Sequence, residues 1–432
     1  MYREIKQCRC CQSSNLYKYL DLGLQPLANS YHKDPNEKLP EFPLEVMVCQ
    51  NCWHSQLSVV VEPNLMFKNY LYVSGTSQTF HLHCEALANE AYAQYIKNNG
   101  CKDPIVLDIA CNDGTLLSCF KNMECKVCGV DPAENLREFT KEKDIPVLVD
   151  YWGRNAVDNI LDFLDLNFKT PKNQEEQITA DIITATNVFA HVDDLDGFLD
   201  TCHKVLTPTR GILVIEFPYC EEMIQHVEFD TVYHEHLSYF TFNSFSSLIS
   251  RNNFSIVKYT RTSIHGGSIR FFLKPLKYAF NISRTKTTDL TMAEKEKGLY
   301  NLETYDAFSE KVAKNKIDLN YLMDSLKNKT KVIGFAASAK GNTMLNHFKI
   351  NLDYIVDENP LKFSYYTPGM NIPIYSTDVL KQEKDDLAII VLAWNFYDEI
   401  REKIKKLRPK NRDTLIKYVP NVQEEEIMMR WD

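Results

Sequence analysis

Five short apolar runs within residues 105–218 most constrain how this chain can fold, because helix-like stretches separate each run from the next. The runs read IVLDIA, CKVCGVD, PVLVD, ADIITATNV and GILVIEFP. Such alternation of buried strands and helices predicts a mostly parallel, doubly wound sheet. Two further extended runs, NFSIVKYTRT and GGSIRFFLKPL, are neighbours in the chain and are expected to add an antiparallel hairpin at one edge of that sheet.

A second strand-turn-helix pattern begins at KVIGFAASAKGNT and continues through LDYIVDENP and LAIIVLAW, which predicts a Rossmann-like C-terminal domain. The stretch before it is rich in Lys, Glu, Asp and Leu and predicts one or two amphipathic helices that connect the two α/β regions. The N-terminal stretch is rich in loops and carries short strand-like runs. The predicted domains are residues 1–75, 76–284, 285–330 (helical connector) and 331–432.

Composition excludes several classes of function. The chain has 432 residues, enough for two or three domains, and its 44% hydrophobic and 25% charged residues are typical of an ordinary globular protein. A net charge of -9 opposes binding to a nucleic-acid backbone. No apolar stretch reaches the roughly 18 residues of a membrane span, and the N-terminus has no signal-peptide core. We therefore expect a cytoplasmic protein with no nucleic-acid or membrane partner; the sequence leaves its oligomeric state open.

The four cysteines of two CxxC motifs lie near the N-terminus: Cys8, Cys11, Cys49 and Cys52. Two residues between paired cysteines let both thiolates reach one tetrahedral ion, so these residues predict a zinc site. Four sulfur ligands leave no position for a reactive water, so the predicted zinc is structural. Cys10 and His54 are rival ligands that the sequence leaves open.

The run VLDIACNDGTLL places a strand, an acid, a tight turn and the start of a helix in succession, as at the adenosyl site of doubly wound sheets. Ala110 and Asn112 stand where a dinucleotide fingerprint has its first two glycines, so there is no glycine-rich cradle for a pyrophosphate. Acids close three consecutive expected strands, which favours S-adenosylmethionine (SAM) over NAD. The predicted cofactor-binding residues are Asp108, Asn112, Gly114, Asp131, Asp150 and Asn187.

Histidines concentrate at the ends of expected elements in the central region: His191, His234, His236 and His265. Each one alone is more often a structural group whose hydrogen bonds are satisfied. The segment YHEH is different, because it combines a phenol, a carboxylate and two imidazoles, the groups that acid-base catalysis uses.

Further motifs follow in one order along nearly the whole chain: CRCC, LDLGLQPLANSY, FPLEVMVCQNC, YLYVSGTS, HLH, NVFAHVDD, EFPY, YHEHLSYF, HGGSIRFF, AKGNT, VDENP and TPGMNIPI. On these motifs the chain resembles the nucleotide-sugar C-methyltransferases of deoxysugar biosynthesis, including those that methylate C3 of 4-keto sugars. The resemblance implies a zinc-bearing N-terminal domain, a central SAM-binding domain of the class I methyltransferase fold, and a C-terminal α/β domain that helps to hold a nucleotide-linked keto sugar. His54 and Cys111 are small departures from the family pattern.

The resemblance also implies a sugar site lined by Tyr72, His191, Tyr233, Glu235 and His236, with His236 as the base. A base of near-neutral pKa can remove a proton beside a ketone when the enolate oxygen is stabilised, and the enolate carbon then attacks the sulfonium methyl. Glu235 or His234 is expected to orient His236, while Tyr233, Tyr72 or His191 is expected to donate to the oxygen. No catalytic metal is expected.

The AKGNT turn opens a helix, so its backbone amides and Lys340 are expected to meet a diphosphate; a tight turn with a solvated lysine is the alternative. Asn342 and His265 complete the predicted substrate-binding set. Two other functions stay open here: an NAD-dependent sugar-nucleotide oxidoreductase or epimerase, and a non-catalytic binding or assembly module. The sequence leaves open the methylated ring carbon, the nucleotide carrier and an amino group on the sugar.

Overall fold

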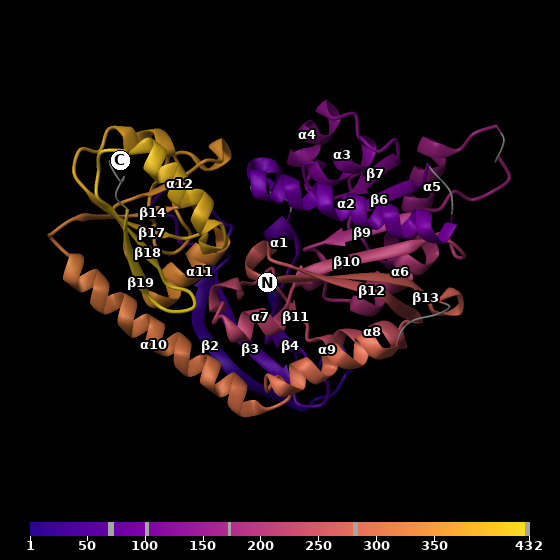
Figure 1. Cartoon of the computed structure of the whole chain (residues 1–432), viewed down its shortest axis with the longest axis horizontal. Helices are drawn as coiled ribbons and strands as arrows, with labels where there is room; N and C mark the ends of the chain where they lie inside the picture. Colours follow the sequence, from indigo (N-terminus) through magenta and orange to yellow (C-terminus); the bar gives the residue numbers. More distant parts are fainter. Residues whose placement is uncertain (68–72, 100–102, 172–173, 280–283, 428–432) are drawn as a thin grey trace.

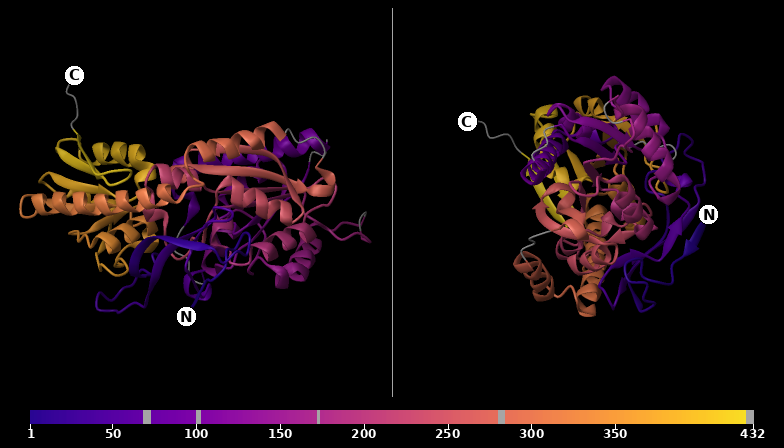
Figure 2. Two further views of the ribbon diagram at one scale, coloured as in Figure 1. Left: turned by 90° about the horizontal axis from the view of Figure 1, so that it is seen from below. Right: turned by 90° about the vertical axis from the view of Figure 1, so that its right-hand side faces the viewer.

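The computed structural model describes residues 1–67, 73–99, 103–171, 174–279 and 284–427, and every structural statement below refers to these residues. Two α/β units lie side by side along the long axis of the molecule, with the central unit in purple and pink and the C-terminal unit in orange and yellow (Figure 1). Figure 2 shows the same arrangement from two further directions. A sheet from the N-terminal residues lies against both units. None of the described helices combines the length and apolarity that a bilayer span needs.

The central unit is built on a seven-stranded sheet in the order β12-β13-β10-β9-β6-β7-β8. Its strands are β6 (Ile105–Ile109), β7 (Lys126–Val130), β8 (Val147–Leu148), β9 (Ile182–Thr186), β10 (Ile212–Pro218), β12 (Phe254–Thr262) and β13 (Ser268–Pro275). Strands β6 to β10 are parallel, and β12 and β13 add the predicted antiparallel hairpin beside β10. The strand order reverses between β6 and β9, where sheets of this kind bind ligands outside the carboxyl ends of the strands.

Most of the described central helices pack on this sheet through buried apolar side chains. They are α2 (Gln78–Asn99), α3 (Thr115–Lys121), α4 (Arg137–Glu142), α5 (Val157–Phe168), α6 (Leu195–Val205), α7 (Cys220–Gln225) and α8 (Phe242–Arg251). In α6, for example, the side chain of Asp194 caps the first turn by accepting from the Gly197 amide, and Phe198, Leu199 and Cys202 are buried. The predicted doubly wound α/β fold is therefore confirmed for this unit.

The C-terminal unit contains a six-stranded sheet in the order β16-β15-β14-β17-β18-β19, in which only β19 is antiparallel to its neighbour. Its elements are β14 (Lys331–Phe335), α11 (Ala339–Phe348), β15 (Ile355–Asp357), β16 (Ile374–Ser376), β17 (Leu387–Val391), α12 (Tyr397–Leu407), β18 (Asp413–Lys417) and β19 (Gln423–Ile427). This order also reverses at its first strand, β14, as a Rossmann-like unit requires.

The two α/β units share one turn geometry after their first strand. Ala110 follows β6 with φ 56°, and Ala336 follows β14 with φ 73°. In each unit an aspartate from the end of the next strand, Asp131 or Asp357, accepts a backbone N–H from this turn and another from two residues further along its own loop. A carboxylate thus replaces the usual glycines in holding the turn.

The N-terminal residues form a four-stranded antiparallel sheet in the order β11-β4-β3-β2 and a two-stranded ribbon of β1 and β5. Their bounds are β1 (Tyr2–Glu4), β2 (Leu16–Pro26), β3 (Glu41–Cys49), β4 (Ser55–Leu57), β5 (Val59–Val61), the short helix α1 (Asn64–Phe67) and β11 (Ser238–Tyr239). The edge strand β11 comes from the central unit and directly follows the YHEH segment. The N-terminal sheet is therefore completed by the chain that carries the predicted catalytic residues.

The predicted connector forms two helices, α9 (Arg284–Glu296) and α10 (Leu302–Leu326). Helix α10 does more than connect, because Tyr305, Phe308 and Leu319 are buried in a core that also takes in residues of β2, β3, α7 and the C-terminal sheet. The diagonal path of α10 along the lower edge of the molecule is clear in Figure 1. One apolar core thus joins three parts that the sequence suggests are separate.

Replacing Leu319 by alanine should lower the free energy of unfolding by about 2–5 kcal/mol, because the change leaves a cavity in this shared core. Leu319 is 0% exposed, whereas Ile317 on the same helix is 69% exposed, so Ile317→Ala is the matched control and should change stability by about 0.5 kcal/mol or less. Urea denaturation followed by circular dichroism measures both. Equal losses in the two variants would contradict a core that includes α10.

Candidate active site

A cavity of about 560 Å³ lies between the central and C-terminal units. Most of the residues predicted to bind ligands line it: Asp108, Asn112, Asp131, Asp150, Asn187, His191, Tyr233, His236, His265 and Lys340. Gly114, Glu235 and Asn342 are not among its lining residues, and Tyr72 lies outside the described residues. The cavity therefore brings together groups from the carboxyl ends of strands in both sheets.

The turn after β6 forms one end of the cavity. Asp131 accepts the backbone N–H of Asn112 at 2.8 Å and that of Ala133 at 2.8 Å, so its carboxylate is fixed at the carboxyl end of β7. Burial raises the pKa of this carboxyl group. Gly114 has φ 75° and begins α3; a Cβ there would lie 3.1 Å from Ile145, so this glycine shapes the turn from the side that faces α4 and its following loop.

Two other predicted cofactor residues have well-defined partners. Asp108, buried within β6, accepts from the Thr184 hydroxyl at 2.6 Å, and burial raises its pKa to about 7. Asp150 lies beyond the end of β8, where it accepts from the Tyr151 amide and the Asn159 side chain. Both line the cavity.

The side chain of Asn187 is placed to bond a ligand in this cavity. It has φ 56°, and its backbone N–H donates to the Glu216 carbonyl at 2.8 Å, which fixes the turn after β9. Its buried Oδ1 has no hydrogen-bond partner among the described residues. Because an unsatisfied buried acceptor is costly, this atom indicates a site for a donor on a bound molecule. An amino acid end such as that of SAM supplies one.

The segment 73–77 is attached to the cofactor turn. The Ser74 amide donates to Oδ1 of Asn112 at 2.9 Å, and the Gly75 amide donates to Oδ2 of Asp113 at 3.1 Å. A Cβ on Gly75 would lie 2.4 Å from that Asp113 oxygen, so only glycine allows this approach. Asp113, which no sequence motif marked as a site residue, joins the cofactor turn to segment 73–77.

The two candidate histidines of the sugar site face each other. The ring centroids of His191 and His236 are 4.9 Å apart, and those of Tyr233 and His236 are 4.0 Å apart. Nδ1 of His236 bonds the Thr231 carbonyl at 2.7 Å, and Nε2 bonds the Tyr233 hydroxyl at 2.7 Å. A carbonyl only accepts, so Nδ1 carries the proton, and the Nε2 lone pair accepts from the phenol.

Burial keeps these imidazoles neutral. It lowers the pKa of His236 well below the ordinary histidine value, with a further contribution from the neighbouring His191. It lowers the pKa of His191 to about 4. Nε2 of His191 is buried and has no hydrogen-bond partner among the described residues, so this ring can still bond a ligand.

The prediction that Glu235 or His234 orients His236 is wrong. Both of its ring nitrogens are bonded, to Thr231 and Tyr233, and neither bond involves Glu235 or His234. Glu235 instead accepts from the Asn29 side chain at 2.7 Å, and His234 donates to the Pro43 carbonyl at 3.2 Å. Both residues attach the YHEH segment to the N-terminal module, and a backbone carbonyl orients His236.

Of the three predicted substrate-binding residues, Lys340 and His265 line the cavity and Asn342 does not. Lys340, in the first turn of α11, donates to the His265 carbonyl at 3.1 Å and lies 4.3 Å from the ring centroid of Trp394. His265 adopts φ 57°, and burial lowers its pKa to about 3. Asn342 is 1% exposed and donates to the Ala28 carbonyl at 2.8 Å, so it fastens α11 to the N-terminal module.

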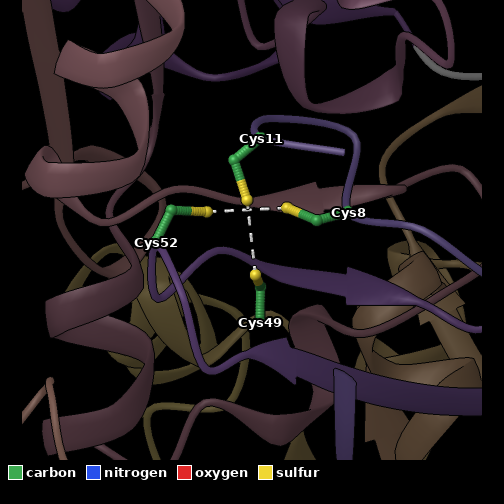
Figure 3. A group of neighbouring side chains, drawn as sticks. All are labelled: Cys8, Cys11, Cys49 and Cys52. Carbon is green, nitrogen blue, oxygen red and sulfur yellow. Dashed lines mark hydrogen bonds between the residues drawn. The ribbon is translucent and has the colours of Figure 1, made fainter. Parts of the chain in front are cut away.

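The four predicted zinc ligands lie together. Figure 3 shows the sulfur atoms of the two CxxC motifs pointing toward a common centre, and all four lie within 4.8 Å of one another. Each motif forms the same knuckle, in which the first cysteine carbonyl accepts from an amide four residues later. A tetrahedral set of thiolates suits zinc and leaves no open position. Within the described residues, this metal-ligand group includes neither Cys10 nor His54, whose Nε2 bonds the Ser238 hydroxyl at 3.2 Å.

The strand order of the central sheet, the cavity at its point of reversal and the acids around the cofactor turn together define a SAM-dependent methyltransferase. Three family models match the chain in succession: "Putative zinc binding domain" over residues 8–67, methyltransferase domain over 83–259 and C-methyltransferase C-terminal domain over 263–420. The chain thus carries in succession a zinc-binding module, a methyltransferase domain and a C-methyltransferase C-terminal domain, and it is a SAM-dependent C-methyltransferase. SAM is its methyl donor, and zinc is the metal of its N-terminal module.

The chain is also similar to individual proteins. The chain is 26% identical over 412 residues to the C-methyltransferase NovU of Streptomyces niveus, a match that covers 94% of this chain and 93% of the relative. Among solved structures, it is similar to the magnesium protoporphyrin IX methyltransferase of Synechocystis PCC 6803, with 12% identity, 47% of this chain and 86% of the other covered, and a TM-score of 0.33. A 1,6-didemethyltoxoflavin-N1-methyltransferase of Burkholderia thailandensis has 16% identity, 44% and 79% coverage, and a TM-score of 0.30.

Removing one zinc ligand should cost the protein its metal. Because the four thiolates hold the two knuckles together, Cys49→Ala should contain much less zinc than wild type and unfold at a lower temperature. Plasma mass spectrometry and differential scanning fluorimetry measure the two effects. Cys10→Ala is the matched control and should keep the metal; zinc lost from Cys10→Ala and retained in Cys49→Ala would reverse the ligand assignment.

Proposed function

We propose that this chain methylates the ring carbon next to the ketone of a nucleotide-linked keto-deoxysugar. The observation that supports it most directly is the neutral His236, whose Nε2 lone pair meets the Tyr233 hydroxyl inside a cavity shared by the SAM turn and the C-terminal unit. A neutral imidazole shielded from water is suited to remove a proton from carbon. The likeness to the C-methyltransferase NovU agrees with transfer to carbon.

The proposed reaction begins at His236. When the ketone enters, the Tyr233 hydroxyl turns from Nε2 toward the carbonyl oxygen, which frees the lone pair to take the proton from the adjacent carbon. The C–H electron pair becomes the enolate, and its oxygen is stabilised by the Tyr233 hydroxyl and by the unpartnered ring nitrogen of His191. When bound, SAM would supply the methyl group: the enolate carbon would form the new bond to it as the methyl–sulfur bond breaks and S-adenosylhomocysteine leaves. The Thr231 carbonyl stabilises the imidazolium through Nδ1–H.

The nucleotide end of the substrate is proposed to lie against the C-terminal unit. Residues of this unit line the cavity opposite the SAM turn, including Ser338, Asn359 and Asn395. Backbone amides at the start of α11 suit a diphosphate. The Lys340 ammonium already donates to the His265 carbonyl, which holds it toward the histidine end of the cavity, so the amides are the better-placed phosphate donors. A cytoplasmic location and the role of Tyr72 stay predictions of the sequence.

His236→Asn should abolish methylation while SAM still binds, because the amide cannot take the carbon-bound proton. The assay uses mass spectrometry with SAM and a panel of nucleotide 4-keto-6-deoxy sugars in heavy water. With S-adenosylhomocysteine in place of SAM, wild type should exchange the proton next to the ketone for deuterium, and the variant should not. Calorimetry measures SAM binding.

His203→Asn is the matched control, because His203 lies outside the cavity and bonds only the Asn252 carbonyl among the interactions described. It should exchange and methylate at the wild-type rate. Turnover by His236→Asn equal to wild type would remove His236 from the mechanism. Wild type that binds SAM but shows no exchange or methylation across the panel would favour the non-catalytic alternative.

Methylation should keep its rate at pH values just below the ordinary histidine pKa of 6.5. Burial disfavours the imidazolium, so the folded-state pKa of His236 is lowered and its neutral, active form persists as the pH falls through 6.5. The pH dependence of kcat, measured with both substrates saturating, should therefore decline only well below pH 6.5. A half-maximal rate at or above 6.5 that is traced to His236 would contradict a buried neutral base.

A further inference from the structure

Asp230 is a buried carboxylate that the proposed mechanism does not use. It lies in the 3-10 turn Phe229–Thr231 of the central unit and is 0% exposed. One carboxylate oxygen, Oδ2, accepts from the Trp394 indole N–H at 2.7 Å and from the Tyr418 hydroxyl at 2.7 Å. Both donors belong to the C-terminal unit. The carboxylate thus joins the two α/β units directly behind the cavity.

The residue after Asp230 carries the carbonyl that orients the base. The Thr231 oxygen accepts from Nδ1 of His236 at 2.7 Å, and the turn that contains it is closed by a bond from the Thr231 amide to the Glu228 carbonyl at 3.1 Å. Because a 3-10 turn leaves little torsional freedom between adjacent residues, anchoring the Asp230 side chain also fixes the direction of the Thr231 carbonyl. The position and tautomer of His236 depend on that direction.

Keeping this carboxylate buried is unfavourable for stability. Its other oxygen, Oδ1, has no hydrogen-bond partner among the described residues. A buried carboxylate with two side-chain donors loses more hydration than these two bonds replace. Burial raises its pKa, and the nearby ammonium of Lys340 opposes that rise. Unfavourable burial of this kind beside a proposed catalytic group is typical of a residue whose role is to hold a fixed geometry.

We propose that Asp230 is a positioning residue for methyl transfer: it fixes the Thr231 carbonyl against the C-terminal unit and so holds His236 with Nε2 unprotonated and able to act as the base. This inference rests on the proposed function, in which His236 removes the proton. It adds that the C-terminal unit, which is proposed to hold the nucleotide, also fixes the position of His236. Trp394 and Tyr418 act through Asp230 and do not line the cavity.

Four variants test the proposal. Asp230→Ala removes both bonds, and Tyr418→Phe removes one. Asp230→Asn keeps an oxygen that can accept both bonds, so it separates position from charge. Tyr354→Phe is the matched control, because it removes a tyrosine hydroxyl bond of 2.9 Å, to Glu383, elsewhere in the C-terminal unit. The readouts are kcat and KM for the sugar, the deuterium exchange rate with S-adenosylhomocysteine, SAM affinity and thermal stability.

Asp230→Ala should lower kcat and the exchange rate together by about tenfold to a hundredfold, because a misplaced base loses its near-attack geometry. KM and SAM affinity should change by about twofold or less. Tyr418→Phe should show a smaller loss of the same kind, whereas Asp230→Asn and Tyr354→Phe should act like wild type. Exchange at the wild-type rate in Asp230→Ala overturns the proposal, and so does an Asp230→Asn variant as slow as Asp230→Ala.

A second readout needs no substrate. Nitrogen-15 NMR of histidine-labelled protein, with the His236 signals assigned by their loss in His236→Asn, should show the proton on Nδ1 in wild type and in Asp230→Asn. In Asp230→Ala this tautomer preference should weaken; an unchanged preference overturns the proposal. Wild type that shows the Nδ1–H tautomer but exchanges no keto sugar would contradict the proposed function. The NMR comparison of wild type with Asp230→Ala would still test the positioning of His236 by Asp230.

Discussion

The segment 229–239 has to satisfy all three parts of the molecule at once, and the active site depends on this constraint. Its start is bonded to Trp394 and Tyr418 of the C-terminal unit. Its middle is attached to the N-terminal module through Glu235, and its end forms β11 at the edge of the N-terminal sheet. Because both sides hold the segment, His236 is placed by the assembly of the chain and not by a local loop alone.

This constraint explains why a structural zinc site belongs to an enzyme of carbon chemistry. The second cysteine knuckle, Cys49 to Cys52, lies between β3 and β4, and β4 pairs directly with β11 two residues beyond His236. The metal holds the turn between β3 and β4 to the first knuckle, Cys8 to Cys11. The zinc is therefore expected to act on catalysis through the register of the segment that carries the proposed base.

The sequence predicted elements whose signal is local and missed contacts whose partners are distant. Apolar runs, their spacing and the CxxC pairs were enough for the central sheet, its antiparallel hairpin, the C-terminal unit and the zinc cluster. Asn342 was predicted to bind substrate, but it donates to Ala28, 314 positions away in the chain. The orienting group of His236 is a backbone carbonyl, which every residue possesses, so no residue type marks Thr231 in the sequence.

Burial has two opposite effects on His236 as a proposed base. A lowered pKa keeps the imidazole neutral, yet the same shift makes Nε2 a weaker proton acceptor. In the proposed mechanism, stabilisation of the enolate oxygen rather than the strength of the base therefore drives proton removal from carbon. The cavity holds two groups suited to this, the Tyr233 hydroxyl and the ring of His191, in contact with His236. The low dielectric around the buried His236 that weakens the base also strengthens these hydrogen bonds, so burial serves both halves of the proposed reaction.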